Sequence, residues 1–228
     1  MGNFVHEVLE NLYALPLEER TQDTAGCSKE ALMSRTGLIS QIWYSDGWGE
    51  KVIPYLRNQT ISDFKWSCVW CVRNAFSVEN PQSFTPDGIE YELNGKIGDV
   101  QMRGFIDRWL MENNTLVISD YKTGKTPSPR YMSDKFFQLS IYSLLLSQVV
   151  QSDDFKLELL YLNNDAVKRT HVPTPQEFDE ATETIITVKK EIDTSYESGN
   201  WEAIPSRLCD WCSYKRTVCT YWNKKNER

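Results

Sequence analysis

Residues 97–123 read IGDVQMRGFIDRWLMENNTLVISDYKT, and this stretch decides the fold class. Two runs rich in apolar residues flank Asn113-Asn114. Asparagine tolerates left-handed backbone conformations, so this pair suits a tight turn. We therefore expect strands at 97–108 and 115–123, joined as an antiparallel hairpin.

The register of this hairpin brings two carboxylates together. Glu112 faces Thr115 across a two-residue turn, and counting back pairs Asp107 with Asp120. Directly opposed residues have Cβ atoms about 4.5–5.5 Å apart, and Lys122 shares the face of Asp120 because side chains alternate along a strand. Opposed like charges destabilise a sheet, and a divalent cation such as Mg²⁺ would compensate them because it prefers oxygen ligands. The pattern alone is equally consistent with a solvent-exposed hairpin face that merely carries these charges.

The rest of the chain predicts an α/β fold, a central mixed β-sheet with this antiparallel hairpin, flanked by helices. Asn94-Gly95 is expected to be a second hairpin turn, Ser133 a helix cap, and Thr174 to Glu177 a capping box. Further strands are predicted at 89–94 and 155–162, and helices at 4–15, 28–44, 46–57, 61–75, 133–149 and from about 175 to 197. The expected parts are a helical region at 1–88, a core at 89–200 and a tail at 201–228.

Composition limits the classes of function. The net charge of −7 over 228 residues argues against a protein that coats nucleic acid by bulk charge, although it allows one local basic groove. No apolar run is long enough to cross a membrane, and the first residues do not resemble a signal peptide. We expect a cytoplasmic protein without a membrane partner, in which the six cysteines do not form disulfides.

Four short motifs together resemble one known family. They are Gly2 to Glu10 (GNFVHEVLE), Gly104 to Arg108 (GFIDR), Ser119 to Lys125 (SDYKTGK) and the Gln138-x3-Tyr142 pair. This set resembles the RecB-type nuclease domain of the PD-(D/E)XK superfamily, a branch that includes exonucleases of CRISPR adaptation and phage recombination nucleases. The resemblance runs from Gly2 to Trp222, is weak between residues 27 and 80, and implies a restriction-endonuclease-like core.

The resemblance implies roles for the matching residues. The implied metal ligands are His6, Asp107, Asp120 and the backbone carbonyl of Tyr121, with Lys122 as the catalytic lysine. The implied supporting or DNA-contacting residues are Gln138, Tyr142 and Glu90, and Lys125 and Arg130 are either phosphate contacts or simply solvated. The implied activity is a Mg²⁺- or Mn²⁺-dependent exonuclease acting on DNA, with single-stranded ends as the expected substrate. A protein partner in a recombination or CRISPR adaptation complex is a further expectation.

The C-terminal cysteines form a separate motif. Cys209-x2-Cys212-x6-Cys219 resembles the motif of iron–sulfur members of the family, in which three such thiolates and one thiolate upstream of the histidine hold a [4Fe–4S] cluster. No cysteine precedes His6, so the fourth ligand is not found, and zinc is the alternative metal for thiolate ligands. The remaining cysteines, Cys27, Cys68 and Cys71, are expected to be buried structural thiols, and free thiols in a disordered tail remain an alternative for the C-terminal three.

Two other classes of function stay open. One is a catalytically idle DNA-binding module, against which the intact set of Asp107, Asp120 and Lys122 argues. The other is a zinc-bound structural protein, in which the cysteines matter and the hairpin does not. A nuclease assay with Mg²⁺ or Mn²⁺ would separate these classes from the enzyme.

Overall fold

The computed structural model describes the chain except residues 57, 129, 131, 153, 164–165, 216, 220 and 223–228 and the side chains of residues 133 and 134. It divides into two compact units, Met1–Ile186 and Thr187–Arg228. The end of the predicted helix at 46–57 and the last six residues of the predicted tail lie outside the described part. The predicted cap at Ser133 is wrong, because Met132 is the N-cap and Ser133 is the first residue of the helix. The first unit contains the sheet and all the elements that position the candidate site.

The first unit is built on one five-stranded sheet in the order β1-β2-β3-β4-β5. Strands β3 and β4 pair in parallel and the other neighbours are antiparallel, so the predicted mixed α/β sheet is confirmed. The strand bounds are Gly88–Ile97 for β1, Val100–Glu112 for β2, Thr115–Lys122 for β3, Asp154–Tyr161 for β4 and Val167–His171 for β5. The short β5 was not predicted, because its polar sequence VKRTH lacks the apolar alternation of a half-buried strand.

The turn between β2 and β3 is as predicted. Asn113 and Asn114 adopt φ values of 49° and 67°, and Glu112 pairs with Thr115. Both angles are left-handed, as a two-residue hairpin turn of this hand requires. The register set by this turn therefore holds into the candidate site.

The predicted turn at Asn94-Gly95 is wrong. Both residues lie inside β1, and the chain instead reverses at Gly98-Asp99, where Gly98 has φ 57°. Gly95 is needed for a different reason, because a Cβ atom there would lie 2.8 Å from Oε1 of Gln148. The glycine thus allows close packing against the segment that follows α7.

Helices α1 (Gly2–Tyr13), α6 (Ile61–Val78), α7 (Ser133–Leu146) and α8 (Pro175–Ser198) correspond to predicted helices. The predicted helix at 28–44 is wrong, because it is split into α3 (Lys29–Ser34) and α4 (Gly37–Ser45). Gly37 has φ 80°, a conformation that interrupts a helix, and a Cβ there would lie 2.5 Å from the Cα of Gly26. The predicted helix at 46–57 is reduced to α5 (Trp48–Lys51) and a 3-10 turn, Ile53–Tyr55, which contains Pro54. Among the described residues, the other short helical elements are α2 (Gln22–Ala25) and the 3-10 turns Leu17–Glu19 and Arg207–Trp211.

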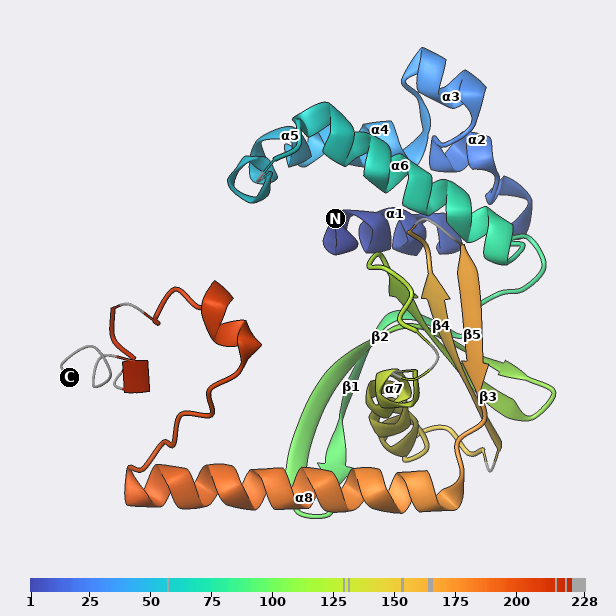
Figure 1. Cartoon of the computed structure of the whole chain (residues 1–228). Helices are drawn as coiled ribbons and strands as arrows, with labels where there is room; N and C mark the ends of the chain where they lie inside the picture. The colour runs from blue at the N-terminus through green and yellow to red at the C-terminus, as the bar shows by residue number, and fades with distance from the viewer. Residues whose placement is uncertain are drawn as a thin grey trace. The chain divides into compact units, whose positions relative to one another are not determined.

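Two apolar cores hold the sheet in place. Helices α1 and α6 lie side by side and share one core with Tyr121, Leu160 and Leu162, while α7 packs on β1, β3 and β4 (Figure 1). The second core joins Leu139 and Leu146 of α7 to the sheet. No helix in the described part of the chain is long and apolar enough to cross a bilayer.

Candidate active site

Helix α1 brings His6 to the sheet. Val5, Val8, Leu9 and Leu12 are fully buried, which fixes the rotation of the helix about its axis. In this orientation His6 Nε2 donates a hydrogen bond to the backbone carbonyl of Tyr121 at 2.9 Å. The other ring nitrogen, Nδ1, lies 3.4 Å from Asp107 Oδ1 and 3.8 Å from Glu90 Oε1.

Three carboxylates lie on three adjacent strands. Residues paired on either side place Glu90 of β1 opposite Asp107 of β2, and the β2–β3 pairing ends at Arg108 and Ser119, directly before Asp107 and Asp120. Glu90 has φ 42°, an uncommon value for a residue with a side chain. Such strain often occurs at functional sites, and here it accompanies a row of like charges that a sheet would not otherwise favour.

Asp107 is oriented by the backbone of the next strand. Its Oδ2 accepts a hydrogen bond from the Tyr121 N–H at 2.7 Å, so the carboxylate replaces the next backbone contact between β2 and β3. Oδ1 is then directed toward His6. A carboxylate held through one oxygen presents the other in a fixed direction, which is the usual arrangement of a metal ligand.

Asp120 is buried, with 7% of its surface exposed, and its Oδ2 lies 2.6 Å from Lys122 Nζ. The contact is ionic and lacks hydrogen-bond geometry, so this oxygen has no hydrogen-bond partner in the described structure. Burial and the charge of Asp107 raise the pKa of Asp120 to about 6, and Lys122 and His6 only partly offset them. A buried, incompletely compensated carboxylate of this kind is a plain candidate for a cation ligand.

His6 carries the opposite charge in the absence of an ion. Burial lowers its pKa, but hydrogen bonds to Asp107 and Glu90 and the charge of Asp107 outweigh burial and raise the pKa to about 10. In the metal-free protein, a proton on the imidazole ring thus compensates the negative charge of the carboxylates, as a bound cation would. Metal binding to His6 has to displace that proton.

The donor set fits a small divalent ion. Among the described residues, the cluster whose ligand atoms lie within 4.8 Å of one another is His6, Glu90 and Asp107, and Asp120 stands beside this trio on β3. Carboxylate and carbonyl oxygens suit Mg²⁺ and Mn²⁺, and an imidazole nitrogen is better suited to Mn²⁺.

The comparison with known families agrees with this geometry. A family model described as the PD-(D/E)XK nuclease superfamily matches residues 1–220. The chain belongs to this superfamily. Its members generally use divalent metal ions, and the His6, Glu90 and Asp107 cluster is of a kind that could hold one.

Individual relatives of this PD-(D/E)XK chain are distant. The gene 69 protein of Mycobacterium phage L5 is 25% identical over 145 residues, which is 63% of this chain and 47% of that protein. The chain thus matches about half the length of this relative. A crystal structure of a "putative exonuclease" from Eubacterium rectale matches with a TM-score of 0.51 and 15% identity over 78% of this chain and 73% of that one. At 15% sequence identity, this structural similarity supports the fold alone.

Of the expected supporting residues, Glu90 lies with His6 and Asp107, while Gln138 and Tyr142 contact each other beside β2. Gln138 Nε2 donates to the Tyr142 hydroxyl at 2.6 Å, and a Cβ at Gly104 would lie 2.7 Å from Tyr142 Cε1. Gly104 in the GFIDR motif therefore makes room for the tyrosine ring. Lys125 and Arg130 are both exposed in the segment between β3 and α7, where a phosphate could reach them.

Sequence analysis missed a buried ionic network on the opposite sheet face. Arg108 is 1% exposed, donates to both carboxylate oxygens of Glu79, and bonds the Tyr121 hydroxyl at 2.9 Å and Ser119 Oγ at 3.0 Å. Glu158 lies 3.8 Å from the same guanidinium. The network anchors Tyr121, whose backbone contacts His6 and Asp107. The only signal in the sequence was a charged residue at a position where β2 faces the core.

The cysteines divide as expected into two sets. Cys27, Cys68 and Cys71 are buried, as predicted, and burial raises their pKa values to about 11, 12 and 11. In the second unit, Cys212 is exposed, while Cys209 and Cys219 are partly exposed. A hydrogen bond from the Ser206 backbone lowers the pKa of the Cys209 thiol. The sulfurs of the three C-terminal cysteines do not lie within 4.8 Å of one another, so their described positions do not form a cluster site.

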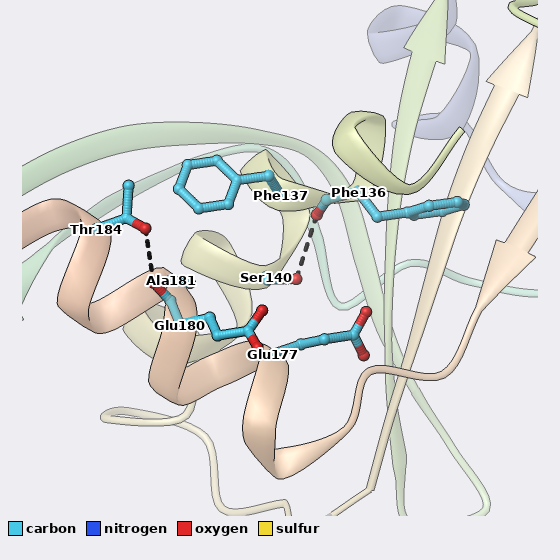
Figure 2. A pocket seen from close by; sticks show the side chains of 7 residues that line it. All are labelled: Phe136, Phe137, Ser140, Glu177, Glu180, Ala181 and Thr184. Carbon is cyan, nitrogen blue, oxygen red and sulfur yellow. Dashed lines mark hydrogen bonds between the residues drawn. The ribbon is translucent and has the colours of Figure 1, made fainter. Parts of the chain in front are cut away.

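A hollow of about 530 Å³ lies between α7 and the first turns of α8 (Figure 2). Phe136 and Phe137 line it from α7, while Glu177 and Glu180 line it from α8. Its polar groups mostly satisfy one another, since Ser140 bonds the Phe136 carbonyl and Glu177 bonds His171 at 2.8 Å. Two carboxylates would repel a phosphate, so this hollow is not suited to a nucleic-acid backbone.

Proposed function

We propose that this chain is a Mn²⁺- or Mg²⁺-dependent deoxyribonuclease that removes nucleotides from DNA ends, with single-stranded DNA as its substrate. The observation that carries the proposal is the convergence of His6, Asp107, Asp120 and Lys122 from α1, β2 and β3. These residues are far apart in sequence, and no structural need explains three in-register acids at this position. Superfamily membership supports hydrolysis of a phosphodiester as the chemistry.

In the proposed mechanism a divalent ion would be held by His6, Asp107, Asp120 and the Tyr121 carbonyl, with Glu90 beside them. When bound, such an ion would supply Lewis acidity and neutralise charge on the scissile phosphate. Lys122 Nζ, oriented by Asp120 at 2.6 Å and partly exposed, donates to a phosphate oxygen as negative charge develops on it. Asp107 keeps its position through the Tyr121 N–H, so the geometry is set before substrate arrives.

Three roles are proposed for residues around this centre. Gln138 and Tyr142 brace β2 at Gly104 and position the strand that carries Asp107. Lys125 and Arg130 contact substrate phosphates from the segment after β3. We propose that Cys209, Cys212 and Cys219 form an incomplete iron–sulfur or zinc ligand set, which supports the fold and takes no part in hydrolysis. A protein partner in recombination or CRISPR adaptation is a separate part of the proposal.

The test is a cleavage assay on labelled linear and circular single-stranded DNA and on the matching duplex. We expect Mn²⁺ or Mg²⁺ to support release of nucleotides from linear strands, EDTA to stop it, and Ca²⁺ not to support turnover. Degradation of the circle at the same rate would refute the exonuclease assignment. Absence of cleavage of every DNA with either ion would favour the idle binding module.

A further inference from the structure

The helical region carries a groove that the proposed mechanism does not use. It has a volume of about 580 Å³ and is formed by α1, α5, the 3-10 turn at Ile53–Tyr55 and α6. The residues that matter are Asn3, Trp48, Lys51 and Tyr55 around the buried Val52 and Phe64. Tyr55 is 76% exposed, so its ring is accessible to a ligand in the groove.

Trp48 is held as a fixed platform in this groove. Its ring meets Phe4 edge-on, with centroids 5.3 Å apart and an interplanar angle of 76°. Its Nε1–H donates to Glu7 Oε2 at 3.0 Å. Because one edge of the indole is packed and its N–H is bonded, another ring could stack on it at little cost in side-chain entropy.

Two aromatic rings in this helical region, Trp48 and Tyr44, have a lysine ammonium beside them. Lys51 Nζ lies 5.4 Å from the Trp48 ring centroid. A second hollow of about 260 Å³ is lined by Tyr44 and by Lys65 of α6. Lys65 Nζ lies 4.6 Å from the centroid of the Tyr44 ring. The same pairing therefore occurs twice, and an aromatic face beside a cation is the combination that binds a base together with its phosphate.

The groove adjoins the candidate active site through the first turns of α1. Trp48 is bonded to Glu7, the residue next to His6. Gly2, beside Asn3 of the groove, lies against Thr123, because a Cβ there would be 3.6 Å from Thr123 Oγ1. Thr123 directly follows Lys122. The groove and the candidate active site therefore share the first turns of α1.

We infer that this groove binds unpaired nucleotides of the DNA strand that enters the active site, with bases stacked on Trp48 and Tyr55 and a phosphate at Lys51. The inference rests on the proposed function. It adds where the DNA strand binds and how the protein selects unpaired nucleotides. Bases in a duplex are stacked on one another and cannot occupy an aromatic platform, whereas those of a single strand can. The groove accounts for a single-strand preference without a strongly basic chain.

Binding is measured by fluorescence anisotropy with a labelled oligothymidylate and a duplex of mixed sequence, in Ca²⁺ and in EDTA so that nothing is cleaved. The test variants are Tyr55→Ala and Lys51→Ala, with Tyr55→Phe as the variant that keeps the ring. Tyr196→Ala, an 80% exposed tyrosine on α8, and Lys29→Ala on α3 are the matched controls. Each variant's fold is checked by circular dichroism.

We expect Tyr55→Ala to weaken single-strand binding by about tenfold or more, and Tyr55→Phe and both controls to bind as the natural chain does. Lys51→Ala should also reduce the slope of log affinity against log salt by about 0.7. Unchanged single-strand affinity in Tyr55→Ala and Lys51→Ala would overturn the inference even if the protein cleaves DNA, and would leave the groove to a protein partner. Absence of cleavage with normal single-strand binding would instead refute the proposed function alone.

Discussion

Replacing Asp120 by asparagine should make the metal-free protein more stable at pH 8 while destroying its metal site. Asp120 has a pKa of about 6 against an ordinary value of 3.8. At about 1.4 kcal/mol per pH unit, the gap between these values corresponds to about 3 kcal/mol. Asparagine fits the same space without the charge that burial and Asp107 oppose.

The sign follows from proton linkage. Between pH 3.8 and 6 the folded protein holds the proton on Asp120 more tightly than the unfolded chain, so the free energy of unfolding falls as pH rises through this window. Above pH 6 the folded protein bears the full cost of the ionised group. Because the pKa of about 6 already includes the attraction to Lys122, we expect a net gain of about 1–3 kcal/mol at pH 8 and about half of it at pH 5.

The assay is urea unfolding in EDTA at both pH values, with Asp179→Asn, an exposed aspartate of α8, as the matched control that should change stability by less than about 0.5 kcal/mol. Added Mn²⁺ should stabilise the natural chain and not the Asp120→Asn variant. A variant that is less stable than the natural chain at pH 8, or equally shifted at both pH values, would refute the account of a repulsive site compensated by a cation.

The remaining predictions concern the proton on His6, the ionic network and the cysteines. Because the pKa of His6 is about 10 in the metal-free protein, Mn²⁺ binding at pH 7.5 should release one proton, and calorimetry in two buffers of different ionisation enthalpy would show it; a buffer-independent heat would contradict it. Arg108→Met should lower the free energy of unfolding by about 3–5 kcal/mol, because the buried Glu79 loses its bidentate partner and keeps only Tyr13 and Lys168; a loss under 1 kcal/mol in urea unfolding would show that the network is dispensable. Anaerobically purified protein should contain well under four irons per chain, and a full complement in iron and sulfide analysis would mean that another cysteine completes the set.

The sequence was sufficient where local chemistry decides the structure. Asn113-Asn114 set the hairpin register because asparagine tolerates left-handed angles, and period two then placed Asp107, Asp120 and Lys122 on one face. The same reasoning failed at Asn94-Gly95. There a glycine is needed because Gly95 packs closely against Gln148, a tertiary contact that no local sequence pattern reveals.

Other parts of the site depend on contacts between residues far apart in sequence. The position of His6 beside Tyr121 rests on the packing of α1, and the family motif pointed to it although periodicity alone could not. Glu90 turned out to lie closer to His6 and Asp107 than its motif suggested, because β1 pairs with β2 in a register that a wrongly placed turn had obscured. The bond between Arg108 and Glu79 links β2 to the end of α6, so it was invisible before the fold was known.

The most direct measurement is the rate at which Asp120→Ala releases nucleotides from an end-labelled single strand in Mn²⁺, compared with the natural chain and with Asp179→Ala. The account predicts that the natural chain and Asp179→Ala cleave at similar rates, and that Asp120→Ala is slower by about a hundredfold or more because it lacks a metal ligand and the partner of Lys122. Circular dichroism must show that the variant is folded. Cleavage by folded Asp120→Ala at the natural rate would contradict the claim that Asp120 belongs to the active centre.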